Sequence, residues 1–190
     1  SAAFASTCAT SAETSFCISS ADFSRPACSF SAAACCSRSE IRSAKIPPAP
    51  GPWPPSPYDR IEERYPEAYL RRQLEQCLRN LGVECIDVLQ LHTWTRAWNR
   101  NPVALEILRQ FQKEGKILGI GISTPEHDQN ALVELMRGGW LDSVQVIYNI
   151  FEQEPQAEFF PTAMEHNVGV IVRVVFDESS LTGKLSAQTR

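Results

Sequence analysis

The sequence lacks the features that mark several classes of protein. It has no long basic cluster, since 18 Lys and Arg stand against 22 Asp and Glu for a formal net charge of −4, so we expect no binding to nucleic acid. No run approaches the ~18 consecutive apolar residues of a membrane-spanning helix. The first residues lack the basic start and continuous apolar core of a signal peptide. We therefore expect a cytoplasmic protein that does not associate with membranes.

Metal-binding and disulfide patterns are also lacking. Of the seven cysteines, five fall within the first 36 residues, and none has the paired CxxC spacing of a zinc site. We expect no metal site. Cys77 and Cys85 are expected to act as small buried hydrophobic residues.

Composition divides the chain into regions of different character. Residues 1–43 are rich in Ser, Ala and Cys and have no helical or strand periodicity, so no element is predicted there. The segment is either genuine or the product of a frameshift or a mispredicted exon. Residues 44–190 are expected to form one domain. Within it, seven prolines among positions 47–57 exclude a helix and a central strand, which predicts an extended loop.

Regular helix signals begin at Pro66. Leucines recur at helical spacing from Leu70 to Leu81, and Gly82 stands where a helix commonly ends. A second helix is predicted to open with Asn101 as its cap and Pro102 at its first position, and to stop near Gly115. The pair Thr124-Pro125 repeats this signal for a third helix, ended by Gly138-Gly139, and a fourth is predicted over 157–166.

A short apolar run follows each helix, in the order CIDVLQLH, KILGIGIS, SVQVIYNIF and VGVIVRV. Runs that are apolar on both faces are typical of parallel strands covered on both sides. Their recurrence about every 25 to 31 residues predicts right-handed βαβ units, in a doubly wound sheet or a (β/α)8 barrel. No GxGxxG follows any strand, which weakens the doubly wound alternative. The predicted fold class is α/β, as an incomplete (β/α)8 TIM barrel of about five βα units.

Four segments taken in order resemble the aldo-keto reductase family: LRNLGVECIDVLQLHTW, EGKILGIGIST, VQVIYNIF and VGVIVRVVFDESSLTGKL. The resemblance runs roughly from Ala44 to Lys184 and would make these strands the third to the seventh of a barrel. It implies an oxidoreductase that reduces a small-molecule carbonyl compound to an alcohol. The implied cofactor is NADP(H).

The resemblance also implies catalytic positions. In such enzymes a tyrosine gives a proton to the carbonyl oxygen, a lysine paired with an aspartate lowers the pKa of that tyrosine from ~10, and a histidine orients the substrate. Lys45 matches the lysine and His92 the histidine. His92 would end its strand at the carboxyl edge, where barrel active sites lie. The alternatives are a surface lysine and a core histidine.

Cofactor and substrate positions carry over in the same way. Ser123, Thr124 and Gln145 would approach the nicotinamide carboxamide, and Arg173 would stack on its ring. The implied pyrophosphate contacts are backbone amides of Leu181, Thr182 and Gly183. Thr124 has the alternative of a helix cap, and Gln145 that of an ordinary polar residue of the barrel. The predicted substrate wall, suited to a planar or carboxylate-bearing carbonyl, consists of Trp53, Trp94, Arg96 and Trp98, with local packing as the alternative for the indoles.

The tyrosine and aspartate of the family pattern are missing. No tyrosine precedes Tyr58, and Asp22, the only aspartate before Lys45, lies in SSADFSRP, which does not match a DTAxxYG segment. We therefore expect little or no turnover. Five strands would also leave open edges, so we expect poor stability as a lone monomer and a protein partner that covers the edges. The alternatives are a non-catalytic cofactor-binding or partner-binding barrel fragment and a nonfunctional gene-model product.

Overall fold

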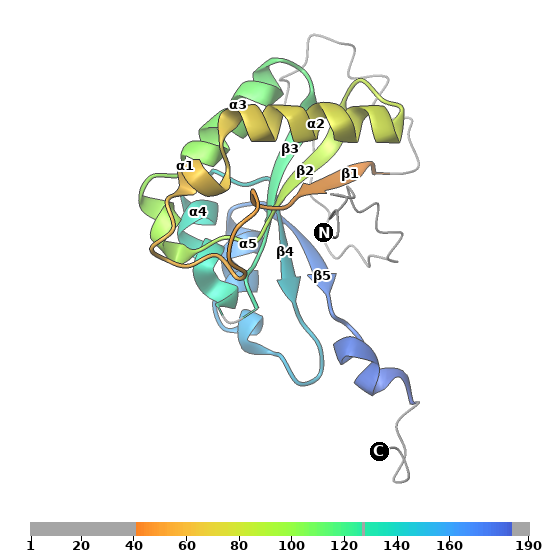
Figure 1. The fold of residues 1–190 in the computed structure, drawn as a ribbon. Helices are drawn as coiled ribbons and strands as arrows, with labels where there is room; N and C mark the ends of the chain where they lie inside the picture. Colours follow the sequence, from red (N-terminus) through yellow and green to blue (C-terminus); the bar gives the residue numbers. More distant parts are fainter. Residues whose placement is uncertain (1–40, 127, 184–190) are drawn as a thin grey trace, which may run out of the picture.

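The computed structural model describes residues 41–126 and 128–183. These residues form one sheet of five parallel strands that neighbour each other in chain order (Figure 1). The strands are β1 (Ser43–Ile46), β2 (Ile86–His92), β3 (Ile117–Ser123), β4 (Ser143–Ile147) and β5 (Gly169–Arg173). The predicted α/β fold of about five βα units is confirmed. The prediction for residues 1–43 lies almost wholly outside the described residues.

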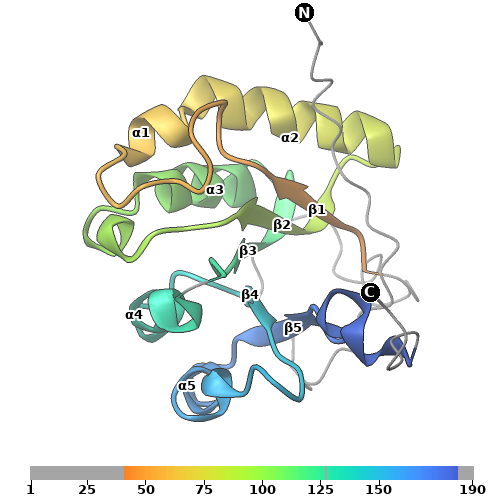
Figure 2. The ribbon, with the colours of Figure 1, turned by 60° about the horizontal axis from the view of Figure 1, so that its bottom comes forward.

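Helices follow the strands and cover one face of the sheet. They are α1 (Ile61–Arg64), α2 (Glu67–Leu81), α3 (Val103–Lys113), α4 (Val133–Arg137) and α5 (Phe159–Glu165). Short 3-10 turns are η2 (Arg96–Arg100), η3 (Gln129–Leu132), η4 (Glu154–Gln156) and η5 (Asp177–Thr182). In Figure 2 the helices α2 to α5 form an arc with the strands on its inner side. Among the described residues, no helix combines the length and the apolar character needed to cross a membrane.

The helix predicted from Pro66 is confirmed as α2. Pro66 is its N-cap residue, and Gly82 ends it with φ +63°, a left-handed conformation that costs glycine little. Leu70, Leu74 and Leu78 are buried on one face of α2, as their spacing predicts. The leucine repeat therefore places α2 against the sheet.

Two predicted helix starts are wrong. Pro102 precedes α3, which begins at Val103, and Asn101 makes no side-chain cap. Thr124 is no cap either, because its amide donates to the Gln145 carbonyl at 2.7 Å and extends the strand pairing. The helical part of that connection begins only at η3. The Thr-Pro signal was misleading because the long-range pairing with β4 competes with local capping.

The two faces of the sheet differ in chemistry, because side chains alternate along each strand. The face towards the helices is apolar and contributes to the core through Ala44, Ile46, Leu89, Leu91, Ile120, Ile122, Val144 and Val146. The other face carries mainly polar residues and glycine, including Ser43, Lys45, Gln90, His92, Gly119, Gly121, Ser123, Ser143, Gln145 and Arg173. The expectation of strands apolar on both faces is therefore wrong for this inner face.

The sheet is strongly curved. The Lys45 ammonium on β1 donates a hydrogen bond to Gln145 Oε1 on β4, although β2 and β3 lie between them. In a flat sheet three strand spacings would separate the two backbones by about 14 Å. The two side chains meet because the strands curl around the inner face, as in part of a barrel. The predicted incomplete (β/α)8 barrel is confirmed in this sense.

Curvature of the sheet leaves little room for side chains on its inner face. A larger residue at position 121 should therefore destabilise the fold. A Cβ on Gly121 would lie 2.5 Å from Ser143 Oγ and 2.9 Å from Gln90 Cγ. We expect Gly121→Ala to lower the free energy of unfolding by roughly 1–3 kcal/mol in denaturant titrations. Gly169→Ala is the matched control, because its nearest atom would lie at 3.6 Å. Equal effects of the two substitutions would contradict this account.

Candidate active site

The carboxyl ends of the strands bring five of the predicted site residues together. His92 pairs in register with Ser123, and Ser123 with Gln145. Lys45 reaches Gln145 by its hydrogen bond, and Arg173 ends β5 in register with the last residue of β4. Residues spread over the chain from β1 to β5 therefore line one inner surface. We call these five residues the strand-end cluster.

Its electrostatics keep His92 neutral at ordinary pH. Burial, followed by the positive charges of Lys45 and Arg173, lowers the pKa of His92 from 6.5 to about 4, against a smaller opposite effect of Glu126. A neutral imidazole has one N–H donor and one acceptor nitrogen. His92 can therefore donate a hydrogen bond to an uncharged carbonyl oxygen without carrying a charge itself.

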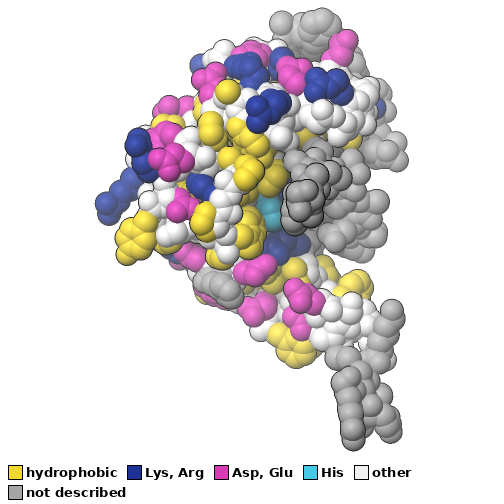
Figure 3. Space-filling model, in the orientation of Figure 1, with side chains coloured by type: hydrophobic (Ala, Val, Ile, Leu, Met, Phe, Trp, Pro, Cys, Tyr) yellow, Lys and Arg dark blue, Asp and Glu magenta, His cyan; other side chains and the backbone are white. Residues whose placement is uncertain are grey.

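Trp53 is the one predicted wall residue that lies at the cluster. It comes from the proline-rich loop between β1 and α1, is 60% exposed, and its ring centroid lies 5.3 Å from that of His92 at an interplanar angle of 34°. Figure 3 shows hydrophobic side chains gathered in the middle of the face it presents, around a histidine. A flat apolar surface therefore borders the neutral imidazole.

Trp94 and Trp98 are placed differently from the expectation. They are 1% and 4% exposed, pack edge to face at a centroid distance of 5.4 Å, and so cannot touch a ligand in this structure. The indole N–H of Trp94 donates to Asn99 Oδ1 and that of Trp98 to the Asp59 carbonyl, each at 2.8 Å. The packing alternative holds for both, because each buried N–H has a protein acceptor.

Arg96 is not an isolated cation. Its Nε and Nη2 donate to the two carboxylate oxygens of Asp128 at 3.0 and 2.6 Å, a bidentate ion pair on the surface. The hydrogen bond with Asp128 raises the pKa of Arg96. The expectation of a carboxylate-binding cation from this residue therefore loses its physical basis.

The residues beside His92 fit the carboxamide end of a nicotinamide. Ser123 is 1% exposed and its hydroxyl has no hydrogen-bond partner, while Gln145 presents an amide one strand away. A primary carboxamide offers both donors and acceptors, which suits a hydroxyl and an amide placed together. Thr124 is already engaged, since its hydroxyl donates to Gln129 Oε1 at 2.7 Å and its carbonyl accepts from Arg173 Nη2 at 3.2 Å.

The predicted pyrophosphate contacts lie in and after η5. The amide of Leu181 donates to the Phe176 carbonyl at 3.2 Å, so it is used inside the turn. Thr182 donates its hydroxyl to the Ser179 carbonyl, and Gly183 ends the turn with φ +74°. Figures 1 and 2 show η5 beyond the end of β5, outside the arc of helices. Because the Leu181 amide already donates within the turn, it is not available to a pyrophosphate in this arrangement.

Tyrosine hydroxyls in the described part of the chain all lie away from a proton-donor position. Tyr65 is buried, its hydroxyl donates to the His92 carbonyl at 2.8 Å, and burial raises its pKa well above 10. Tyr69 donates to the Pro47 carbonyl, Tyr148 accepts from the Gln156 amide, and Tyr58 is 95% exposed. The sequence did not predict that Tyr65 binds the end of β2, because its partner is a backbone carbonyl and no sequence motif indicates such a contact.

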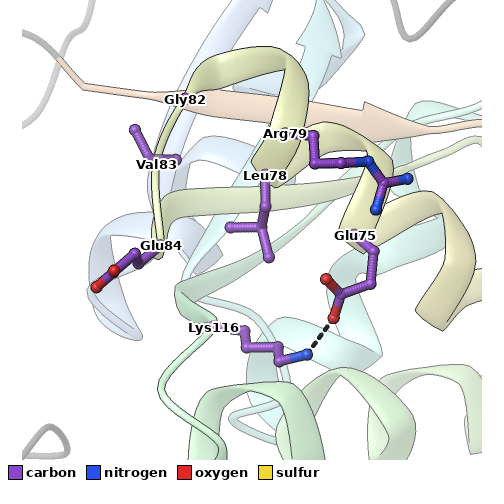
Figure 4. A pocket seen from close by; sticks show the side chains of 7 residues that line it. All are labelled: Glu75, Leu78, Arg79, Gly82, Val83, Glu84 and Lys116. Carbon is purple, nitrogen blue, oxygen red and sulfur yellow. Dashed lines mark hydrogen bonds and ion pairs between the residues drawn. The ribbon is translucent and has the colours of Figure 1, made fainter.

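A shallow hollow lies at the other end of the strands (Figure 4). It is lined by Glu75, Leu78, Arg79, Gly82, Val83, Glu84 and Lys116. Lys116 immediately precedes β3, and its ion pair with Glu75 crosses the hollow. The hollow is therefore not part of the strand-end cluster. Over residues 41–126 and 128–183, no group of three or more His, Cys, Asp or Glu is arranged to hold a metal ion.

A curved parallel sheet with helices outside and a polar cluster at its carboxyl ends defines part of a (β/α)8-barrel protein. The family model described as "Aldo/keto reductase family" matches residues 55–189. The chain belongs to the aldo-keto reductase family.

Curated relatives and solved structures agree with this assignment. The NADH-specific methylglyoxal reductase of Escherichia coli is 27% identical over 119 residues, 62% of this chain and 36% of that protein. The holo form of an aldo-keto reductase from Bacillus halodurans superposes with a TM-score of 0.58 at 26% identity, over 79% of this chain and 46% of that one. A glycerol dehydrogenase from Gluconobacter oxydans superposes with a TM-score of 0.54 at 27% identity, over 65% of this chain and 37% of that one. This chain thus spans less than half the length of these relatives.

The environment of His92 predicts a specific loss of stability in acid. Its pKa is about 4 in the folded chain and near 6.5 when unfolded, so the unfolded state binds a proton first as the pH falls. The free energy of unfolding should therefore decrease between about pH 6.5 and pH 4, by about 1 to 2 kcal/mol from this residue, because solvent screening at a partly exposed imidazole reduces the full effect of the shift. Denaturant titrations across this range should show a shallower decrease for His92→Asn.

The control is His166→Asn, which changes an exposed histidine after α5. It makes the same chemical change outside the strand-end cluster. Parallel curves for the unaltered chain and His92→Asn would contradict the assigned environment.

Proposed function

We propose that this chain forms part of a nicotinamide-dependent carbonyl reductase, with the reaction site at the strand-end cluster. The observation that carries the proposal is the hydrogen bond from Lys45 to Gln145 on the inner surface that also presents His92. It unites a lysine and a histidine of the family pattern with a residue at the expected carboxamide position. NADP(H) is the proposed cofactor, and the cytoplasm is the proposed location, which rests on the sequence alone.

The residues support distinct roles. Ser123 and Gln145 would hold the carboxamide of the cofactor, which supplies the hydride for carbonyl reduction. Neutral His92 would donate a hydrogen bond to the substrate oxygen, and the Lys45 charge would stabilise negative charge that develops there. Trp53 would support the apolar part of a flat substrate. Arg173 is proposed to lie along the nicotinamide side of the cluster, tied in place by its bond to the Thr124 carbonyl.

The proposed enzyme is impaired, because no tyrosine of the described residues takes the place of the proton donor. A positioned general acid contributes roughly 10²–10⁴-fold to such reactions. We therefore propose that binding of cofactor survives better than turnover. Carbonyl-dependent oxidation of NADPH at an ordinary enzymatic rate, abolished by His92→Ala, would contradict the impairment and support the catalytic role of His92.

The test of the site is cofactor binding. We expect Gln145→Leu to raise the dissociation constant for NADPH roughly three- to tenfold, since a hydrogen bond contributes about 1 kcal/mol. Binding is measured by isothermal titration with NADPH and NADH in parallel, since one relative is named an NADH-specific reductase. Gln76→Leu is the matched control, because Gln76 lies on the exposed face of α2 and bonds to Asn80 and Arg79. Equal affinities of both variants would refute the proposed carboxamide contact.

A second candidate function is a binding module that pairs with another chain. Every residue of β5 is only half-buried, whereas four of the five residues of β4 are buried. Among the described residues β5 pairs with β4 alone, and an edge strand can take up a strand from a partner. If this candidate is correct, the chain should sediment as an oligomer or complex at micromolar concentration. A monomer that unfolds cooperatively at high temperature would contradict it.

A further inference from the structure

Two adjacent buried residues at the end of α1 reach two different parts of the candidate site. Arg64 is the last residue of α1, and Tyr65 follows it. Both side chains are buried although both are polar, so both need protein partners. Their partners lie in the loop that carries Trp53 and at the strand end that carries His92.

Arg64 anchors the proline-rich loop. Its Nη2 donates to the Pro52 carbonyl at 2.9 Å, next to Trp53, and its own carbonyl accepts from the amide of Ala49 at 2.7 Å. A Cβ on Gly51 would lie 1.7 Å from Arg64 Nη1, so only glycine lets the loop pass this close to the guanidinium. The loop is thus fastened to α1 on both sides of Gly51.

Tyr65 anchors the end of β2. Its hydroxyl lies 2.8 Å from the His92 carbonyl and 3.1 Å from that of Thr93, both of which can accept its hydrogen bond. Thr93 has φ +75°, which is strained for a β-branched residue and persists only where surrounding contacts fix it. The Tyr65 ring packs edge-on against Trp98 at 6.0 Å, which fixes the direction of the hydroxyl.

We infer that Arg64 and Tyr65 act together as positioning residues that set the contact between Trp53 and His92. Arg64 holds the loop that carries the indole, and Tyr65 holds the strand end that carries the imidazole, so α1 links the two. We call this pair the α1 clamp. It deepens the proposed function, since the clamp would orient the substrate-binding histidine and one wall of the pocket. The contact itself exists whether or not the chain is a reductase.

The contact can be measured without any activity. In the chain labelled with ¹³C-histidine, the ring current of Trp53 shifts the His92 ring signals, and the difference from a Trp53→Leu variant isolates that shift. His92→Asn identifies the signals. Tyr65→Phe removes only the hydroxyl, and Arg64→Met removes the charge and donors but keeps an unbranched apolar stem. We expect each to remove more than half of the Trp53-dependent shift.

Conservative and remote variants separate positioning from general stability. Arg64→Lys keeps a positive charge near Asp59, which lies 3.6 Å from Arg64 Nε, and should retain part of the shift. Tyr148→Phe and Arg137→Met make the same chemical changes at the ends of β4 and α4 and should leave the shift unaltered. Thermal unfolding of every variant is followed in parallel by circular dichroism.

The outcomes are distinguishable. Folded Tyr65→Phe and Arg64→Met proteins with an unchanged shift would overturn the clamp. Should either variant fail to fold, Gly51→Ala displaces the Arg64 guanidinium by a change at an exposed loop position and leaves the Arg64 and Tyr65 residues themselves in place. A full shift in that variant would overturn the clamp equally. Loss of the shift in a chain that binds neither NADPH nor NADH supports the clamp and counts against the proposed function alone.

Discussion

The rest of the structure depends on the curvature of the sheet. The hydrogen bond between Lys45 on β1 and Gln145 on β4 shows this curvature. Strands that curl towards one face bring side chains from distant strands together on that face and crowd the space beneath them. Crowding explains why Gly121 faces Ser143 and Gln90 at the base of the cluster. The apolar residues are then left to the outer face, where α2 to α5 bury them. The same bend that completes the core therefore assembles the candidate site.

Assembly of that site opposes stability. Lys45 and Arg173 place two positive charges near the partly buried imidazole of His92. Burial and these charges lower the pKa of His92, so the imidazole remains neutral. The strain at Thr93 has the same character, since a positive φ at a threonine is unfavourable and is tolerated where the Tyr65 hydroxyl meets the adjacent carbonyls. These unfavourable arrangements lie at the strand ends, while the helix-facing core follows the ordinary rules of packing. Local conflict of this kind is typical of functional sites.

The sequence predicted the parts that local patterns determine. The leucine repeat and Gly82 were sufficient for α2, and short apolar runs located the strands. It failed where a distant residue decides the outcome. Thr124 reads as a helix cap until Gln145 pairs with its amide, and Arg96 reads as a lone cation until Asp128, 32 positions away, neutralises it. The placement of Lys45 and His92 in one cluster could be expected only through the family resemblance.

Tyr65 also bears on the proposed chemistry, because it is a buried tyrosine whose hydroxyl contacts the backbone of His92 at the end of β2. It cannot take over proton donation, since its hydroxyl serves backbone carbonyls and burial holds its pKa well above 10. To reach the inner surface it would have to give up its hydrogen bonds to the carbonyls of His92 and Thr93. His92 is no substitute as an acid, because burial and nearby cations lower its pKa to about 4, which leaves the imidazole neutral at pH 7. Among the described residues, the contacts that fix His92 therefore suit a hydrogen-bond donor better than a proton donor.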